Sequence, residues 1–311
     1  METPRHVSVL LQECVENLNI RPDGIYVDGT LGLGGHSEAI ASRLTTGRLI
    51  GIDRDETAIE RAGKRLVRFG DTVTLVHGNF SDTAEILESL GIDGADGMLF
   101  DLGVSSPQLD EAQRGFSYRA EAPLDMRMDA SEGLTAWEVV NTWDENRLNR
   151  ILWDYGEERY ARRITAAILS ARAKKPIDST LELAEIIKSA MPAAALREKQ
   201  HPAKRSFQAI RIAVNDELGA IARMMETAPD KLKVGGRLCV ISFHSLEDRI
   251  VKSGIAAREN GCTCPREAPV CTCGFVRTLR SVSRKPILPG EAELENNPRA
   301  RSAKLRVAER V

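Results

Sequence analysis

Two aspartates and a run of glycines give this sequence its first chemical clue. Ile25 to Val27 are apolar and predict a short strand; Asp28 follows them, and glycines occupy positions 29, 32, 34 and 35 before a helical stretch starts at Ser37. Glycines let a backbone approach a ligand closely because they carry no Cβ. A second apolar stretch ends at Asp53, where a βαβ unit offers a carboxylate to ribose hydroxyls. The pattern predicts a nucleoside-binding site.

The same loop argues against a dinucleotide. Counted from Gly32, the G-x-G-x-x-G fingerprint lacks its third glycine, because Ser37 stands there. Asp28 places an acid where a pyrophosphate would be repelled and where the sulfonium of S-adenosylmethionine would be attracted. A nicotinamide dehydrogenase is therefore disfavoured. The alternative without a ligand is that the glycines only form a tight turn between strand and helix.

Later predicted strands end in further candidates for this site. Phe80 follows the strand Val73–Gly78, and Asp101 ends the strand Gly97–Asp101. Open α/β sheets bind ligands beyond the carboxyl ends of their strands, so we expect Phe80 to stack on an adenine and Asp101 to lie beside the cofactor. Gln108 belongs to the polar, turn-rich segment that follows and joins them. The alternative for Phe80 is an ordinary place in the core.

The order of predicted elements indicates an α/β protein with an insertion. Strands and helices alternate at first, give way to helices from about 135 to 211, and return afterwards. We therefore predict a discontinuous cofactor-binding domain at 1–110 and 212–311 and an inserted helical domain at 111–211. One long helix is expected from Phe207 towards Met225.

Composition sets limits on the class of protein. The 311 residues include 42% hydrophobic and 28% charged residues, with a formal net charge of −2. No apolar run is long enough to span a membrane and the start lacks the apolar stretch of a signal peptide, so we expect a cytoplasmic protein without membrane contact. The near balance of charge gives no global argument for nucleic acid, and any such argument must be local.

Arginines gather in two places that suit phosphate contacts. The helical insertion contributes Arg162, Arg163 and Arg211, and the basic C-terminal segment contributes Arg299 and Arg301. Clustered arginines next to a nucleoside site predict contacts to an RNA backbone. A solvated helix face or ion pairing between helices is the equally simple alternative. Apolar and aromatic residues of the insertion without an obvious partner also leave a homodimer open.

Four cysteines lie close together in two Cys-Thr-Cys pieces. In a cytosolic chain, close thiol pairs favour a metal site over disulfides, although C-x-C is tighter than the usual C-x-x-C of zinc ligands. A structural zinc ion, free thiols, and a disulfide or redox role remain alternatives. Four thiolates would leave zinc no open position, so we expect no part in catalysis. The cysteines are Cys262, Cys264, Cys271 and Cys273.

Several long motifs resemble one family nearly from end to end. The chain is similar to the bacterial 16S rRNA (cytosine-N4) methyltransferase H family, also called MraW. The resemblance lacks the proline expected at Ser8, and it does not extend to the four-cysteine loop. The matching motifs are His6-x-x-Val-Leu-Leu, Asp28-Gly-Thr-x-Gly-x-Gly-Gly-His36, Asp101-Leu-Gly-Val-Ser-Ser-Pro-Gln108, Arg114-Gly-Phe-Ser117, Pro123-Leu-Asp-Met-Arg-Met-Asp129, Phe207-Gln-Ala-x-Arg211, Ile241-Ser-Phe-His-Ser-Leu-Glu-Asp-Arg249 and Asn297-Pro-Arg-x-Arg-Ser302.

The resemblance carries specific expectations. It implies a Rossmann-like class I methyltransferase sheet with a helical insertion for RNA recognition. It also implies transfer of a methyl group from S-adenosylmethionine to N4 of a cytidine in the decoding region of 16S rRNA, within the small ribosomal subunit. The cofactor contacts that it implies are Gly34, Gly35, His36, Asp53, Phe80, Asp101 and Gln108.

The chemistry suggests roles for the polar residues. The lone pair of a cytosine N4 is delocalised into the ring, so the protein must align donor and acceptor and accept hydrogen bonds from the amine. We expect Asp101 mainly to orient the cofactor, and a polar group between Ser105 and Gln108, or His244, to contact N4. Two alternatives remain: methylation of another amine in RNA or in a small metabolite, and a ribosome-assembly factor that binds S-adenosylmethionine without turnover.

Overall fold

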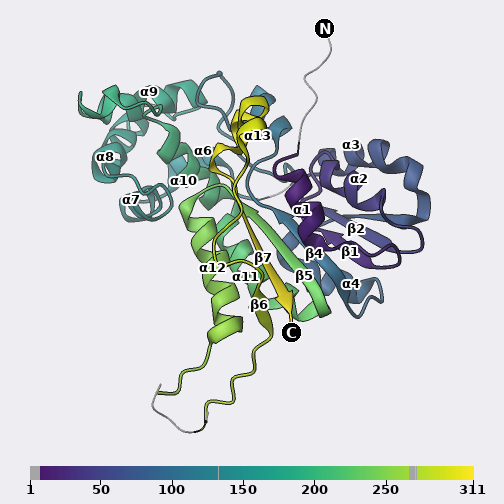
Figure 1. Cartoon of the computed structure of the whole chain (residues 1–311). Coiled ribbons are helices and arrows are strands. Elements are labelled where there is room, and N and C mark those ends of the chain that lie inside the picture. Colours follow the sequence, from purple (N-terminus) through teal and green to yellow (C-terminus); the bar gives the residue numbers. More distant parts are fainter. Residues whose placement is uncertain (1–7, 132, 266–269, 271) are drawn as a thin grey trace. The chain divides into compact units, whose positions relative to one another are not determined.

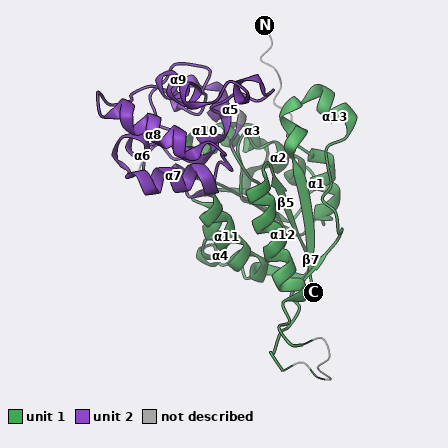
Figure 2. Cartoon of the chain, turned by 90° about the vertical axis from the view of Figure 1, so that its left-hand side faces the viewer, with its two compact units in different colours: residues 1–103, 218–311 green, residues 104–217 purple. Residues whose placement is uncertain are grey.

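The chain forms two compact units. The computed structural model describes residues 8–131, 133–265, 270 and 272–311. Unit 1 comprises residues 1–103 and 218–311, and unit 2 comprises residues 104–217; Figure 2 gives each its own colour. The predicted insertion, 111–211, lies wholly within unit 2.

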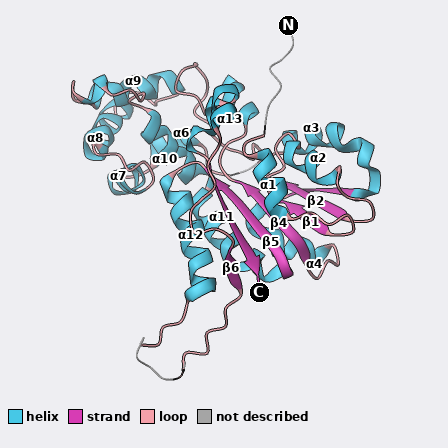
Figure 3. Ribbon diagram, viewed as in Figure 1, coloured by secondary structure: helices cyan, strands magenta, loops and turns pink. Residues whose placement is uncertain are grey.

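Unit 1 is built on a seven-stranded sheet with the order β3-β2-β1-β4-β5-β7-β6, drawn as arrows in Figure 3. The first five strands are parallel, and β7 runs antiparallel to both of its neighbours. Parallel strands bring their carboxyl ends to one edge of a sheet, which is the edge where ligands bind. The strands are β1 (Ile25–Asp28), β2 (Arg48–Asp53), β3 (Val73–His77), β4 (Ala95–Asp101), β5 (Leu232–Ser242), β6 (Leu279–Ser281) and β7 (Lys304–Arg310).

Helices cover both faces of this sheet. Side chains alternate along a strand, so Met98 and Phe100 pack into one core with Met224 and Val251, while Leu99 packs into the other with Cys14. A strand buried on both faces must be apolar throughout, which is why these strands appear as continuous hydrophobic runs. The α-helices of unit 1 are α1 (Leu11–Leu18), α2 (Gly35–Ala41), α3 (Glu56–Leu66), α4 (Thr83–Ser89), α11 (Glu217–Thr227, from Leu218 on), α12 (Ser245–Asn260) and α13 (Glu291–Asn296).

Unit 2 is helical, as its sequence pattern predicts, but a long segment without helix or strand packs into its core. Phe116, Leu124 and Met126 of that segment are buried with the apolar faces of the helices. The amide of Asn215 fixes it, accepting from the N–H of Met128 and donating to the carbonyl of Met126, both at 2.8 Å. The helices are α5 (Ser106–Asp110), α6 (Ala136–Thr142), α7 (Glu145–Asp154), α8 (Ala161–Arg172), α9 (Thr180–Ala190) and α10 (Lys204–Asn215).

The predicted single helix from Phe207 to Met225 is wrong. Helix α10 ends at Asn215, and α11 begins at Glu217. Asp216 between them has φ +47°, a left-handed conformation that ends a right-handed helix. Glycine is the usual residue at such a position, so the aspartate hides the break from a pattern search.

Short 3₁₀ turns complete both units. They are Val67–Thr72, Phe80–Asp82, Ala228–Lys231 and Pro298–Ser302 in unit 1, and Ala112–Arg114 and Ala195–Arg197 in unit 2. Among the residues that the structure describes, no helix is both long and apolar enough to cross a membrane.

Candidate active site

Three neighbouring strands of unit 1 each end in an aspartate. Asp53 ends β2, Asp28 ends β1 and Asp101 ends β4, and β1 lies between the other two. Asp28 is paired with Gly51 of β2 and with Leu99 of β4, so both neighbours run two residues further than β1. The carboxyl edge of the sheet is therefore stepped: β1 ends earlier than its two neighbours, and each of the three strands ends in an aspartate. We call this arrangement the stepped edge.

The glycine loop follows β1 into this step. The N–H of Gly29 donates to the carbonyl of Leu99, and the N–H of Leu31 donates to the carbonyl of Ile52, so the loop bonds to both neighbouring strands. Gly34, the N-cap residue directly before α2, has φ +73°, a conformation that favours glycine. A Cβ at Gly35 would lie 2.0 Å from the Ser8 hydroxyl oxygen, so that position has no room for a side chain.

Asp28 is buried and holds the start of α2. It is 1% exposed, and its Oδ2 accepts from the Ser37 hydroxyl at 2.7 Å. Desolvation by burial raises its pKa to about 6, although the hydrogen bonds from Ser37 and Thr30 act in the opposite direction. Asp28 thus contributes charge to the site and fixes the helix, while its own oxygens are turned inward.

Asp53 is half-buried and is fixed by backbone donors. Its Oδ2 accepts from the N–H of Gly32 at 2.7 Å, and its Oδ1 accepts from the N–H of Asp55 at 2.9 Å. Desolvation raises its pKa to about 6 against the effect of these bonds. Each carboxylate oxygen has a second acceptor site, so Asp53 can still accept from the hydroxyls of a ribose.

Asp101 is the acid with the least compensation. Its Oδ1 is buried and has no hydrogen-bond partner, and its Oδ2 lies 3.9 Å from Nδ1 of His36. Burial raises its pKa well above the usual range, and the charges of Asp28, Glu247 and Glu293 raise it further. A buried polar atom without a partner is rare enough to need an explanation, and a catalytic or ligand-binding role is one of the recognised ones.

His36 connects this acid to the N-terminal segment. Its Nε2 lies 3.0 Å from the carbonyl oxygen of Val9. A carbonyl only accepts, so Nε2 carries a proton, and in a neutral ring Nδ1 faces Asp101 without one. The hydrogen bond to Val9 therefore leaves Nδ1 of the neutral ring as an acceptor that faces Asp101.

Apart from the His36 ring near Asp101, these three acids have no basic side chain paired with them in the part of the chain that the structure describes. Among the described residues, no lysine or arginine forms an ion pair with Asp28, Asp53 or Asp101. Carboxylates gathered in a poorly hydrated place without cations favour a positively charged ligand that has hydroxyl and amino donors. S-adenosylmethionine has a sulfonium, an ammonium and two ribose hydroxyls, so its chemistry fits these residues.

Comparison with known proteins gives this arrangement its context. The model of the MraW methylase family matches residues 3–311. The chain belongs to the MraW methylase family. Relatives named ribosomal RNA small subunit methyltransferase H come from Brevibacillus brevis (57% identity, covering 98% of both chains), Paenibacillus sp. (55%, covering 99% of both) and Clostridioides difficile (53%, covering 98% of this chain and 99% of the relative).

The sheet of this MraW methylase is of the class that the resemblance implied, and it includes a short strand, β6, that the sequence analysis did not predict. Its order, with an antiparallel β7 between β5 and β6, is that of Rossmann-like class I methyltransferases that use S-adenosylmethionine. The fold prediction is therefore confirmed.

Phe80 and His244 are the other predicted site residues in unit 1 that follow strands. Phe80 is half-buried and meets the ring of Phe100 edge to face, with the centroids 6.2 Å apart.

His244 caps α12: its Nδ1 accepts from the N–H of Glu247 at 3.4 Å, and its Nε2 lies 3.1 Å from Oε1 of Glu247. Capping occupies Nδ1 and leaves the proton on Nε2, which makes His244 a poor acceptor for an amine in this state.

Ser105 and Gln108 belong to unit 2. The side-chain oxygen of Gln108 accepts from the N–H of Ser105 at 3.0 Å, and Gln108 is 6% exposed. The two residues thus support each other in the first turn after β4.

The predicted phosphate-binding arginines fall into two groups. Arg162 and Arg163 are exposed on α8, and Arg299 and Arg301 are exposed in the turn before β7. Arg211 instead forms two hydrogen bonds of 2.8 Å with Glu217, which is 6% exposed. Its guanidinium is committed to an ion pair, which is the alternative that the sequence left open.

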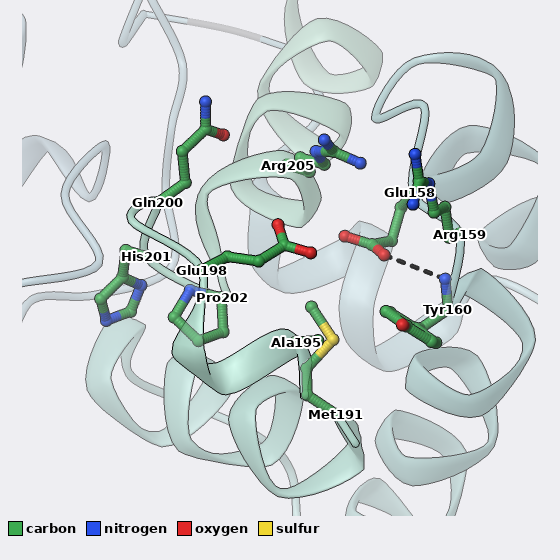
Figure 4. A pocket seen from close by; sticks show the side chains of 10 residues that line it. All are labelled: Glu158, Arg159, Tyr160, Met191, Ala195, Glu198, Gln200, His201, Pro202 and Arg205. Atoms are coloured by element: carbon green, nitrogen blue, oxygen red, sulfur yellow. Dashed lines mark hydrogen bonds between the residues drawn. The ribbon is translucent and has the colours of Figure 1, made fainter. Parts of the chain in front are cut away.

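Unit 2 also contains a pocket, shown in Figure 4 between the start of α8 and the segment before α10. None of the predicted site residues lines it. Glu158, at 2% exposure, accepts from the N–H of Tyr160 at 2.9 Å, which satisfies a donor at the beginning of α8. The buried carboxylate in this pocket is therefore engaged in fixing the start of α8.

Two acids escaped the sequence analysis. Glu247 is fully buried, and its Oε2 accepts from the N–H of Phe243 at 2.7 Å. Glu293 accepts from the N–H of Leu10 at 2.8 Å. Both raise the pKa of Asp101. Glu247 lies within a motif that the sequence analysis recognised, whereas nothing local marks Glu293.

Proposed function

We propose that this MraW methylase transfers a methyl group from S-adenosylmethionine to the exocyclic N4 of a cytidine in the decoding region of 16S rRNA. The names of its relatives support ribosomal RNA of the small subunit as the substrate. The family resemblance supports cytosine N4. We place the reaction in the cytoplasm, on the small ribosomal subunit or a precursor of it.

The stepped edge with Asp28, Asp53 and Asp101 is the observation that carries the proposal. Bound there, S-adenosylmethionine supplies an electrophilic methyl group on a positively charged sulfur. Asp53 accepts from the ribose hydroxyls, and the buried field of the three acids favours the positive charge. Asp101, whose Oδ1 has no partner in the protein, orients the cofactor by accepting from one of its donors. Phe80 stacks on the adenine.

Alignment is the main contribution of the protein to this reaction. A new bond forms between the methyl carbon and N4 as the carbon–sulfur bond breaks, its electron pair stays on sulfur as a neutral thioether, and N4 then loses a proton to water. Holding donor and acceptor in line saves the entropy of bringing them together. The cytidine must first leave its stack at a cost of a few kcal/mol, and the exposed Arg162 and Arg163 would bind the flanking phosphates.

Two further features belong to the proposal. A structural zinc ion bound by cysteines between Cys262 and Cys273 takes no part in methyl transfer. A homodimer would bury apolar and aromatic side chains of unit 2 such as Trp153, which is 61% exposed. Sedimentation at several protein concentrations tests the dimer.

Nucleoside analysis tests the proposed reaction. Small subunits from cells that lack the protein are incubated with it and labelled S-adenosylmethionine, and the RNA is digested and analysed by mass. We expect one labelled N4-methylated cytidine per subunit. A methylated adenosine or a labelled small metabolite would replace the substrate assignment, and cofactor binding without any labelled product would favour an assembly factor.

A further inference from the structure

The loop between α12 and β6 brings three thiols together. In Figure 1 the chain leaves the end of α12 as an extended loop and returns to the edge strand β6. Sγ of Cys262, Cys264 and Cys273 all lie within 4.8 Å of one another. Cys271 lies outside the described residues. The two Cys-Thr-Cys pieces, nine residues apart in the sequence, therefore meet in space.

The spacing of these sulfurs suits a metal. Sγ of Cys262 and Sγ of Cys273 are 3.6 Å apart. A disulfide would require about 2.0 Å, whereas two thiolates on one tetrahedral zinc ion, each about 2.3 Å from the metal, are about 3.8 Å apart. The observed separation is close to the edge of that tetrahedron.

The backbone of the second piece points a donor at the first. The N–H of Thr272 donates to Sγ of Cys264 at 3.2 Å. Backbone N–H groups that donate to ligand sulfurs orient them and stabilise the thiolate, as outer-shell groups do around bound metals. This bond holds Cys264 close to the second Cys-Thr-Cys piece. The backbone therefore helps to position the three thiols.

The described residues of the loop bury little apolar surface away from its junction with α12, where Arg277 donates to the carbonyl of Glu259. Val270 is 70% exposed and Val276 is 74% exposed, so these apolar side chains form no core. A segment that cannot bury apolar surface needs another source of order, and zinc supplies it in small motifs of this kind.

We infer that Cys262, Cys264 and Cys273 bind one zinc ion that orders the loop between α12 and β6. This inference deepens the structural part of the proposed function and is independent of methyl transfer. Each thiol releases its proton as it binds, so uptake of zinc releases protons in proportion to the number of ligands. Zinc neither gains nor loses electrons.

The test uses the full chain, purified without oxygen and stripped with a chelator. Zinc is added back and its stoichiometry measured, and Co²⁺ is used as a spectroscopic probe of tetrahedral thiolate ligation. We expect one metal ion per chain. Cys264→Ser should weaken binding by more than the roughly 10- to 100-fold typical of an outer-shell loss, whereas Thr263→Ala, an exposed neighbour in the same loop, should bind as the unchanged chain does.

Two further readouts make the outcome decisive. Zinc should slow proteolysis between residues 261 and 277 in the unchanged chain and in Thr263→Ala, but not in Cys264→Ser. If Cys271→Ser lowers the thiolate-to-cobalt band, that cysteine is the fourth ligand; an unchanged band indicates a water there, and both results keep the site. Absence of metal uptake in the reduced chain, or uptake that Cys264→Ser leaves unchanged, would overturn the inference.

Cofactor binding separates this inference from the proposed reaction. The same samples are titrated with S-adenosylmethionine and assayed for RNA methylation. We expect Cys264→Ser to keep both within about threefold, since the loop and the strand ends are distinct parts of unit 1. Loss of zinc with retained methylation would leave the reaction standing, and zinc binding in a chain that does not methylate RNA would leave the metal site standing.

Discussion

Strand β4 carries an aspartate near each end, Asp96 and Asp101, and their surroundings shift the two pKa values in opposite directions. Burial alone would raise the pKa of Asp96, but bonds from the N–H of Ile25 and the ammonium of Lys233 outweigh it, and the carboxyl also pairs with Arg21, so the pKa is lowered. Asp101, at the other end, has no such cation, and its pKa is raised. One acid is compensated by neighbouring cations and a backbone N–H, whereas the other has neither a lysine nor an arginine partner among the described residues and is the one that we propose contacts the cofactor.

The arginines of unit 2 divide in the same manner. Arg211 is paired with Glu217 inside the unit, whereas Arg162 and Arg163 are exposed on α8. We expect the paired side chains, Asp96 and Arg211, to contribute to stability. We expect the side chains without such an ion pair among the described residues, Asp101 on β4 and the two exposed arginines on α8, to act on a ligand or on RNA. Three predictions test this division.

The largest effect is expected from exchanging the two aspartates of β4 for asparagine, one at a time. Asp101→Asn should lower kcat/KM for methylation by about 100-fold or more, because a preorganised charge at the cofactor is lost. Its melting temperature should be unchanged or higher, since an uncompensated buried carboxyl is removed. Activity and thermal unfolding are measured on the same preparations.

Asp96→Asn is the matched control and should behave in reverse. Loss of its ionic hydrogen bonds should cost about 1–3 kcal/mol of folding free energy, while kcat/KM stays within about threefold at a temperature where the chain is folded. If Asp101→Asn destabilised the chain as Asp96→Asn does and left activity intact, the contrast between the two ends would be refuted.

The second effect concerns pH. Asp28 and Asp53 have pKa values of about 6 in the free protein. A cationic ligand favours their ionised forms, so affinity for S-adenosylmethionine should be nearly full above about pH 7 and fall by up to about tenfold for each of the two acids between pH 7 and pH 5. Calorimetry at each pH measures this, and Asp53→Asn should bind more weakly at pH 7 with a flatter dependence.

Stability of the ligand-free protein should change in the opposite direction. Between pH 4 and 6 the folded chain holds protons on these acids that the unfolded chain has released, so these two acids should make unfolding easier as pH rises through 6. Asp28→Asn should reduce this effect. A cofactor affinity that is constant with pH, or that grows as pH falls, would show that the charges of these acids do not favour the bound cation.

The smallest effect is expected for RNA binding by unit 2. Replacing Arg162 and Arg163 with glutamine should weaken binding several-fold and lower the slope of log K against log salt by about one for each lost phosphate contact. Arg43→Gln, an exposed arginine of unit 1, serves as the control. Cofactor affinity should be retained in all variants, and unchanged RNA binding would contradict a phosphate-binding role for α8.

Local patterns were enough to predict much of the sheet and its acids. Strand, glycine loop and helix at residues 25–44 form a local signal, and so does an acid at the end of an apolar run. What failed depends on tertiary structure. The break at Asp216 needs a left-handed aspartate, the inward turn of Asp28 depends on Ser37, and the proximity of Glu293 to Asp101 joins distant parts of the chain.

Strand β1 ends two residues before β2 and β4, which leaves a step between the ends of its two neighbours. Strand length is a property of backbone pairing, which replacement of single side chains leaves in place. If the cofactor binds at this step as proposed, variants made for a bulkier analogue of the methyl donor would gain more from shortening β1 than from exchanging glycines in the loop. Shifting β1 by one residue would turn every side chain of that strand to the wrong face, so such redesign should proceed in steps of two.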